Sequence, residues 1–188
     1  MKPRQEHIVE TAVQLFNQRG YFQTSVADID KAANVSKGVF YHYFPNGKKE
    51  LMKQVLSTSL DRVQAHETKI FAENDPVTAC HQLLADLTDE LQNRDDHSVP
   101  VGAFTNDAVR ADPDDQAIIG LSQAIFEVTQ NALRACLLRH GYTSELADQR
   151  SQLFNLAIKG ALSLGVIPTT IAYFQTLDAS LDIFFARS

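Results

Sequence analysis

The stretch from residue 24 to residue 51 constrains the fold most, because it holds two short helical patterns with only a tight turn between them. Ser25 and Asp28 form a Ser-x-x-Asp version of the capping box that begins a helix. Ser36 is a strong N-cap for the second helix. Asn34, just before it, is among the few residues other than glycine that tolerate positive φ. The stretch therefore predicts two short helices joined by a tight turn.

The second short helix is predicted to have one buried side and one open side. Val35 and Phe40 occupy the two positions of a hydrophobic staple, which fixes how the chain enters the helix. Phe40 and Phe44 are expected in the core, and Pro45 ends the helix. Gly38 lies in the first turn, where the missing Cβ lets the backbone approach a partner closely. This pattern is typical of a helix-turn-helix whose second helix lies in the major groove of DNA.

The rest of the chain continues the helical pattern. Apolar residues recur every three or four positions, and no alternating strand pattern competes. All six prolines fall at a terminus or at a proposed boundary. Asp-Pro pairs at 75–76 and 112–113 are expected to begin helices, and Pro168 is expected to block one. The predicted fold is all-α, with nine helices at about 4–19, 25–33, 37–44, 48–72, 76–91, 100–110, 113–140, 144–164 and 170–185.

The composition limits the class of protein. The 188-residue chain is 44% apolar, which suits a globular protein with a sizeable core. No run of about 18 apolar residues exists, so no membrane span is expected, and the charged N-terminus lacks the apolar centre of a signal peptide. Cys80 and Cys136 have no metal-ligand spacing and suit buried roles in a reducing compartment. We expect a cytoplasmic protein with no metal and no cofactor.

Charge is distributed unevenly along the chain. Residues 1–50 carry a net charge of +2 and residues 51–188 carry −8, which together give the −6 of the whole sequence. A basic end on an acidic body is typical of a DNA-binding unit attached to a regulatory domain. The alternative is that a surplus of +2 is too small to indicate any partner.

Residues 16–51 resemble the TetR family of bacterial transcriptional regulators, over about a quarter of the chain. The resemblance implies a helix-turn-helix DNA-binding domain at 1–47, a ligand-binding and dimerisation domain at 48–188, and repression as the default activity. The FPNGKKEL stretch at 44–51 and the VPVGAF stretch at 99–104 are similar to the LmrA/YxaF-like branch, although Val99 stands where that branch often has Cys. The matching residues of the first stretch are Phe16, Gly20, Tyr21, Thr24, Ser25, Val26, Ile29, Ala33, Val35, Ser36, Gly38, Phe40, Tyr41, Phe44, Glu50 and Leu51.

Three residues depart from the usual family pattern. Asn34 stands where Gly is usual, Asp30 where a small Ala is common, and Tyr43 in place of a frequent His. Asp30 is expected to tilt its helix slightly or to be exposed, and Tyr43 to alter one phosphate contact. The operator preference therefore does not transfer from any relative.

The predicted DNA contacts come from the two helix starts and from the second helix. The free N–H groups at Ser25 suit a phosphate, Lys37 can reach guanine or a phosphate, and Val39 can touch a thymine methyl group. For Tyr41 the alternative is a core position, and for Lys48 an ordinary solvated lysine. The full predicted set is Ser25, Ser36, Lys37, Gly38, Val39, Tyr41, His42, Tyr43 and Lys48.

A single DNA-binding domain, here called a head (residues 1–47), has only a small interface with DNA. A homodimer on a palindromic operator is therefore expected. The helix at 144–164 is apolar on two sides rather than along one stripe, and its small residues suit close packing against a partner helix. The alternative is that this helix is central in its own body. The family resemblance favours a four-helix bundle between subunits. The predicted interface is Leu153, Phe154, Ala157, Ile158, Ala161, Leu162, Phe174, Leu177 and Leu181.

TetR-like proteins usually bind a small molecule between the helices of the body, which moves the helix at 48–72 and so the DNA heads. Such sensing is a population shift, in which the inducer prefers the conformation that spreads the heads. Aromatic residues with a few polar groups suit a small apolar or aromatic inducer. The candidate pocket residues are Phe71, His81, Leu84, Phe104, Asn106, Phe126 and Gln130.

Other classes of function have little support in the sequence. It contains no Gly-rich phosphate loop, no nucleophile elbow and no His/Cys cluster, so we expect no enzyme. Cys80 and His81 are adjacent, and on a helix adjacent side chains point apart. One other class stays open, a helical dimer that acts through protein–protein contacts and has a degenerate head. DNA binding at low salt distinguishes the two classes.

Overall fold

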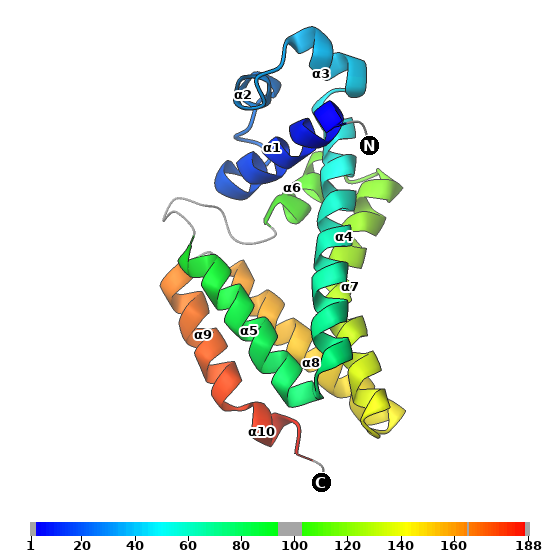
Figure 1. Cartoon of the computed structure of the whole chain (residues 1–188), viewed down its shortest axis with the longest axis vertical. Helices are drawn as coiled ribbons and strands as arrows, with labels where there is room; N and C mark the ends of the chain where they lie inside the picture. Colours follow the sequence, from blue (N-terminus) through cyan, green and yellow to red (C-terminus); the bar gives the residue numbers. More distant parts are fainter. Residues whose placement is uncertain (1–2, 94–102, 165, 187–188) are drawn as a thin grey trace. The chain divides into compact units, whose positions relative to one another are not determined.

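A computed structural model describes residues 3–93, 103–164 and 166–186. These residues form ten helices and no strand (Figure 1), which confirms the all-α prediction. No helix in the described ranges is long and apolar enough to cross a membrane. The helices are α1 (Pro3–Arg19), α2 (Val26–Ala32), α3 (Lys37–Tyr43), α4 (Lys48–Glu73), α5 (Pro76–Gln92), α6 (Ala103–Ala111), α7 (Gln116–Arg139), α8 (Ser144–Ser163), α9 (Ile167–Ala179) and α10 (Leu181–Phe184).

Three predicted boundaries were wrong, each for a local reason. Helix α9 begins before Pro168, which lies in the first turn, where its missing N–H costs nothing. The helix predicted at 170–185 is interrupted at Ser180, so α10 is separate. The cap of α7 is Asp115, whose Oδ1 accepts from the N–H groups of Ala117 and Ile118, and the Asp-Pro pair at 112–113 precedes the helix. The predicted start of α6 at residue 100 lies outside the described residues.

Packing divides the chain into two compact units. Unit 1 comprises the described parts of 1–61 and 97–125, and unit 2 those of 62–96 and 126–188, so that α4 and α7 contribute residues to both. This division differs from a boundary at residues 47 and 48, because α6 and the first parts of α4 and α7 pack with the N-terminal helices. The functional boundary stays a prediction.

Unit 1 is built around the three N-terminal helices. The apolar face of α1 is fully buried, and Phe16 meets Tyr21 edge to face with ring centres 5.4 Å apart. Gly20 ends α1, because its φ of 80° is a backbone conformation that glycine adopts easily. The core also takes one face of α3, α4, α6 and α7, with Ile8, Val9, Ala12, Leu15, Phe16, Tyr21, Ile29, Ala33, Phe40, Phe44, Leu51, Met52, Val55, Leu56, Ala108 and Ile118 buried.

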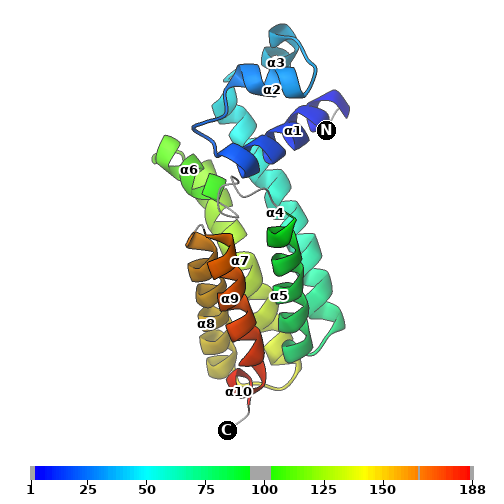
Figure 2. The same cartoon turned by 90° about the vertical axis from the view of Figure 1, so that its left-hand side faces the viewer.

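Unit 2 is a helical body in which α5, α8 and α9 lie side by side (Figure 2). Helix α9 packs against both α5 and α8, and α10 closes against α5 and α9. Asp75 caps α5 by accepting from the N–H groups of Val77 and Thr78, with Pro76 at the first helical position, as predicted. The described core includes Phe71, Cys80, Leu83, Leu84, Leu133, Cys136, Leu137, Phe154, Ile158, Phe174, Leu181 and Phe185.

Candidate nucleic-acid interface

The start of α2 is fixed by a reciprocal capping box. The Ser25 Oγ accepts from the N–H of Asp28 at 3.1 Å, and Asp28 Oδ2 accepts from the N–H of Ser25 at 2.8 Å. The Ser25 hydroxyl also donates to Asp28 Oδ2, and this bond and the one from the Ser25 N–H hold the pKa of the Asp28 carboxyl below its usual value. The predicted capping box is confirmed, and it leaves the side chain of Ser25 exposed at the helix start.

The turn into α3 has the predicted chemistry. Asn34 has φ of 50°, the left-handed region that Asn tolerates. The N–H of Val35 donates to the Asp30 carbonyl at 2.9 Å, which closes the turn. Ser36 then caps α3 by accepting from the N–H of Val39. The caps and this turn hold α3 in one pose although it has only seven residues.

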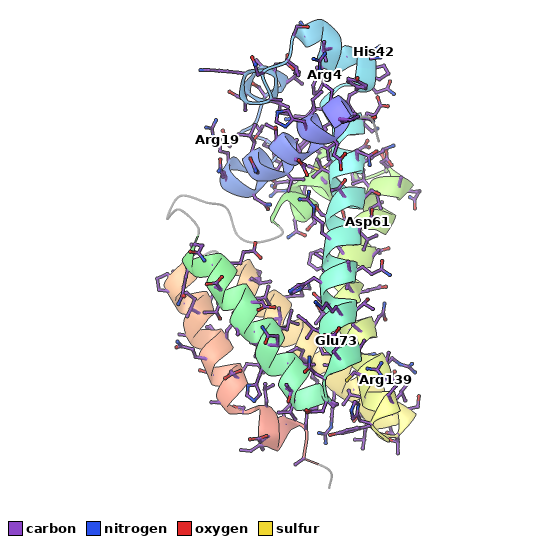
Figure 3. All side chains as sticks on the ribbon, viewed as in Figure 1. Arg4, Arg19, His42, Asp61, Glu73 and Arg139 are labelled. Carbon is purple, nitrogen blue, oxygen red and sulfur yellow. The ribbon has the colours of Figure 1, made fainter. Side chains whose placement is uncertain are left out.

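Helix α3 has one buried and one exposed face. Phe40 and Phe44 are buried, with ring centres 5.4 Å apart, and Val35 packs against the same core. Lys37 and His42 are exposed, and Figure 3 shows His42 pointing away from α3. The exposed face therefore carries cationic and hydrogen-bonding side chains, as a helix that reads DNA requires.

Gly38 has no internal packing reason to be glycine. A Cβ at this position would meet only the Ser36 Oγ at 3.9 Å, which is an ordinary contact. The φ of Gly38 is not among the positive values of the chain, so any residue could adopt its backbone conformation. Glycine inside a helix costs roughly 0.5–1 kcal/mol relative to alanine. This loss of stability is explained if the backbone at Gly38 must come close to a binding partner.

The remaining residues predicted on α3 differ in exposure. Tyr41 is 40% exposed, and the Lys37 ammonium lies 5.9 Å from its ring centre. Its side chain therefore reaches the surface beside Lys37. Val39 and Tyr43 are partly buried and pack against the unit 1 core, so only part of each side chain is available to a partner.

Lys48 does not have the free ammonium that we expected. Its Nζ donates to the carbonyls of Tyr21 and Thr24, both at 2.9 Å, and lies 4.0 Å from the Tyr21 ring centre. Burial lowers the pKa of this ammonium. Two of its three hydrogens are committed to the segment between α1 and α2. Lys48 thus forms an internal tie within unit 1, and its predicted phosphate contact stays a prediction.

Lys49 is also paired within the protein. Its ammonium contacts the Asp112 carboxylate and lies 3.5 Å from that of Asp115, which also binds Lys53 at 2.7 Å. Hydrogen bonds from Lys53 are the main reason that the pKa of Asp115 falls to about 2. These acidic partners explain Lys49 and Lys53 without a phosphate.

Asp30 is not exposed, although exposure was one of the two outcomes expected for it. It is partly buried, and its Oδ1 is buried with no hydrogen-bond partner. Burial raises the pKa of its carboxyl, while the charge of Lys37 lowers it. Asp30 thus places a carboxyl group close enough to Lys37, the first residue of α3, for the two to interact electrostatically.

The predicted dimer interface is corrected by burial. Phe154, Ile158, Phe174 and Leu181 are at most 1% exposed, and Ala161 and Leu162 are also buried within the subunit, so their side chains cannot form a surface. The exposed side of α8 instead carries Leu153 at 55% and Leu156 at 68%, together with exposed Ala157. Leu177 is partly buried. We define the outer face of α8 and α9 as the exposed residues Leu153, Leu156, Ala157, Leu164, Val166 and Tyr173.

The seven predicted pocket residues differ in burial and do not all belong to the same unit. Phe71 is buried, and exposed His81 is bonded through Nδ1 to Asp178 at 2.6 Å. Asn106 is exposed and belongs to unit 1, whereas the side chain of Phe104 lies outside the described residues. Phe126 and Gln130 are partly buried in unit 2, and Leu84 lines a pocket described below.

Two family profiles match the chain. Residues 8–55 match "Bacterial regulatory proteins, tetR family". Residues 76–179 match "Transcriptional regulator LmrA/YxaF-like, C-terminal domain", which covers more than half of the sequence. The chain belongs to the TetR family, in its LmrA/YxaF-like branch. Members of the TetR family are transcriptional regulators, which are generally not enzymes, and they bind operator DNA, dimerise and bind small ligands.

Similar proteins cover most of this TetR-family chain. The uncharacterized regulator YxaF of Bacillus subtilis is 27% identical over 86% of this chain and 84% of its own. The regulator LmrA of the same organism is 24% identical over 86% and 85%. Among solved structures, reduced NemR of E. coli has a TM-score of 0.79 at 18% identity, over 98% of this chain and 99% of NemR. FadR of B. subtilis in complex with stearoyl-CoA has a TM-score of 0.66 at 16% identity, over 94% and 96%. These two structures show the fold.

The body of this TetR-family protein holds a buried polar group that was not predicted from the sequence. Glu67 is 6% exposed, although most glutamates lie at the surface. A signal was present, because Glu67 stands four residues after Val63 and three before Ile70, on the apolar stripe of α4. Burial raises the pKa of its carboxyl, and Thr129, Lys159 and His66 oppose that rise.

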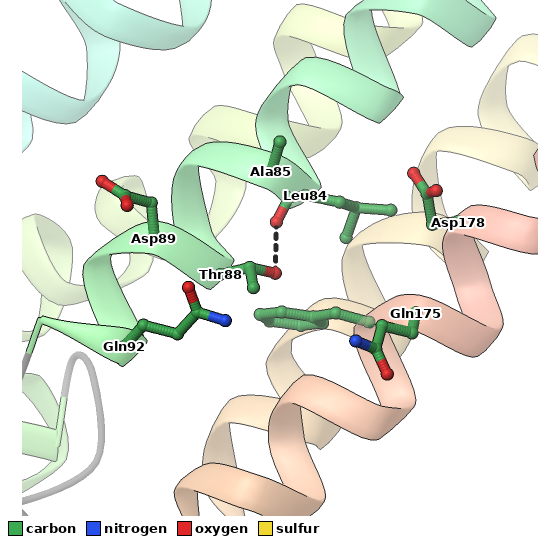
Figure 4. A pocket seen from close by; sticks show the side chains of 8 residues that line it. Leu84, Ala85, Thr88, Asp89, Gln92, Gln175 and Asp178 are labelled. Carbon is green, nitrogen blue, oxygen red and sulfur yellow. Dashed lines mark hydrogen bonds between the residues drawn. The ribbon is translucent and has the colours of Figure 1, made fainter.

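A shallow pocket of about 260 Å³ lies between α5 and α9 in unit 2. Figure 4 shows Leu84, Thr88 and Gln92 of α5 opposite Gln175 and Asp178 of α9. The Thr88 hydroxyl is bonded to the Leu84 carbonyl at 2.7 Å, and Asp178 is bonded to His81. Two of the polar side chains that line the pocket are thus bonded within the protein.

Proposed function

We propose that this TetR-family regulator is a homodimeric repressor that binds a palindromic operator through α3 and leaves it when a small molecule binds in the body. Residues 1–47 are assigned to DNA recognition and residues 48–188 to dimerisation and effector binding. The observation that carries the proposal is the exposed face of α3, where Gly38 has a conformational cost and no packing role.

Lys37 is the residue best placed to test recognition. It is exposed in the first turn of α3 and has no ion-pair partner among the described residues. If it contacts a base, Lys37→Ala weakens specific binding by about 1–3 kcal/mol. The control is Lys69→Ala, an exposed lysine on α4 in unit 2. The assay is fluorescence anisotropy on the DNA beside the regulator's own gene. An unchanged affinity of Lys37→Ala would show that Lys37 does not contact a base.

The outer face of α8 and α9 is proposed as the dimer interface. Leu153, Leu156 and Tyr173 are each more than half exposed on α8 and α9, which pack against each other, and a contiguous patch of exposed apolar side chains marks an interaction site. Pairing this face with a second copy buries them in a four-helix bundle. Two heads can then contact half-sites about 34–36 Å apart.

A single substitution separates this face from other exposed apolar residues. Leu156→Arg places a charge on the outer face and is expected to yield monomers with weakened operator binding. The control is Ile183→Arg on α10, a residue that is 82% exposed and lies outside that face. Sedimentation velocity at micromolar concentration measures both variants. A monomeric wild type, or a dimeric Leu156→Arg variant, contradicts the proposed interface.

Helix α4 is the proposed route from effector to DNA. Its first residues follow the head directly, and its last twelve residues, from 62 to 73, belong to unit 2. An effector that prefers one position of α4 shifts the population of head positions by its differential affinity. The competing function is a helical dimer with a degenerate head. Absence of operator binding at low salt would favour that alternative, whereas salt-sensitive binding at one palindrome supports the repressor.

A further inference from the structure

Unit 2 contains a buried carboxyl group that is only half satisfied. Glu67 on α4 accepts one hydrogen bond through Oε1, from the hydroxyl of Thr129 on α7 at 3.1 Å. Its other oxygen, Oε2, is buried and has no hydrogen-bond partner. Glu67 and Thr129 are 6% and 2% exposed, so bulk water does not solvate the pair. A buried acceptor without a donor is destabilising unless something else supplies the hydrogen bond.

A second acceptor in the same unit is also without a donor. Asn155 on α8 donates through Nδ2 to the Phe126 carbonyl at 3.1 Å. A carbonyl can only accept, so this bond fixes the orientation of the Asn155 amide. Its Oδ1 is then left buried without a partner. Helices α4 and α8 therefore each present one unsatisfied acceptor, and α7 contacts both residues.

The nearby lysine does not supply the missing donor. Lys159 on α8 is partly buried, and its ammonium lies 5.4 Å from the ring centre of Phe126. Its charge and that of Glu67 influence each other, yet no ion pair joins them within the described residues. Burial lowers the pKa of Lys159. A lysine that is partly exposed can extend toward solvent and leave the carboxyl to another donor.

We propose that Glu67 and Asn155 form the polar end of the effector site, and that the effector carries a nitrogen with at least two N–H donors, a primary ammonium or an amidinium, on an aromatic or apolar body. One N–H satisfies Glu67 Oε2 and another satisfies Asn155 Oδ1. The ring of Phe126 packs against the apolar part. The inference rests on the proposed function for its link to DNA release, but the binding chemistry is independent of DNA. A structural role for Glu67 is the competing explanation, and it requires a carboxyl that the fold itself satisfies.

The experiment uses four probes that differ only in the headgroup. These are 4-phenylbutylamine, its trimethylammonium analogue, 4-phenylbutan-1-ol and 5-phenylpentanoate, titrated calorimetrically into the protein. The primary amine is expected to bind, and the other three to bind at least about tenfold more weakly, because charge-assisted hydrogen bonds are the strong ones. Equal binding of the trimethylammonium probe or of the carboxylate overturns the proposal, as does no binding of the amine at millimolar concentration.

Variants assign the binding to this group. Glu67→Gln keeps the size of the side chain and the acceptor for Thr129, and it is expected to weaken amine binding roughly 10- to 100-fold. The matched control is Glu73→Gln, an exposed position on the same helix, with no expected change. Lys159→Met removes a positive charge that repels the ammonium of the probe, and it is expected to strengthen amine binding. An affinity of Glu67→Gln within about twofold of the wild type overturns the proposal.

Two further readouts keep the outcomes distinct. In the absence of probe, Glu67→Gln is expected to unfold at the same temperature as the wild type or higher, since it removes a buried, half-satisfied charge. A clear drop in that temperature would assign Glu67 a structural role and overturn the proposal. Operator binding is measured separately by anisotropy. Amine binding without operator binding refutes the repressor, whereas operator binding without amine binding refutes only this inference.

Discussion

The ammonium of Lys48 permits a sharp test of two roles for one residue. It donates to the Tyr21 and Thr24 carbonyls at 2.9 Å each and lies 4.0 Å from the Tyr21 ring centre. The residues that it holds are buried. As an internal tie, Lys48 stabilises the head. As a phosphate contact, it contributes to the salt dependence of DNA binding.

The size of the effect follows from the contacts that Lys48→Met removes. Methionine preserves most of the stem but leaves both carbonyls without their donor. Hydrogen bonds to charged groups contribute about 1.5–3 kcal/mol each. The ammonium is only partly buried, so hydrogen bonds to water can replace part of this free energy when the ammonium is removed. We expect a loss of about 2 kcal/mol per subunit in the free energy of unfolding.

The assay combines unfolding with the salt dependence of binding. Urea unfolding is followed at one fixed protein concentration, because a dimer's stability depends on concentration. Operator affinity is measured from low to high salt. Each phosphate contact contributes about 0.9 to the slope of log K against log salt, or about 1.8 for two heads. Lys48→Met is expected to lower stability without changing this slope.

The comparison variant is Lys37→Met, at an exposed position of α3. It should weaken DNA binding with little effect on stability, since its exposed ammonium makes a distant contact with the Tyr41 ring and interacts with Asp30 through charge alone. The role of Lys48 as an internal tie is contradicted if Lys48→Met unfolds like the wild type and shows a shallower salt slope. In that case the ammonium leaves the two carbonyls when DNA is present.

Three further outcomes are expected. Ser36→Ala should destabilise the head by about 1 kcal/mol in urea unfolding, because the N–H of Val39 loses its cap; an unchanged midpoint would show that the cap is dispensable. Phe154→Ala should cost about 3–5 kcal/mol, whereas Leu153→Ala, at a 55% exposed neighbour, should cost little in the monomeric Leu156→Arg background; equal losses would contradict the burial assignment. Burial raises the pKa of the Glu67 carboxyl above 4.5, so the folded state binds the carboxyl proton more tightly than the unfolded state. Proton binding by Glu67 therefore stabilises the folded state at low pH, and this contribution is lost as the pH rises. The stability gained by Glu67→Gln should therefore be larger at about pH 7.5 than at about pH 4, and a pH-independent difference would show that Glu67 does not titrate with folding.

Local signals predicted the head well. The capping box at Ser25, the positive φ of Asn34 and the cap at Ser36 all appear as predicted. Each depends on residues within a few positions of one another, so the sequence contains the whole interaction. The break at Ser180 and the start of α9 before Pro168 were missed, because a proline in the first turn and a proline that ends a helix look alike in sequence.

Side-chain roles were less predictable, because they depend on partners far along the chain. Lys48 was expected to face DNA, but its partners lie 24 and 27 residues away. On α8, Phe154 and Leu153 are adjacent and both apolar, yet one is buried and the other is more than half exposed. Periodicity gives the apolar sides of a helix but not which side faces its own subunit.

The sequence by itself determined the helical class, the helix-turn-helix and the family, because periodicity, capping and motif residues are local properties of the chain. Tertiary structure alone decided which lysines are free, which face of α8 and α9 is open, and that Glu67 and Asn155 are left without donors inside the body. Those properties arise from contacts between helices that are far apart in sequence. Burial and hydrogen-bond satisfaction exist only once the helices have packed.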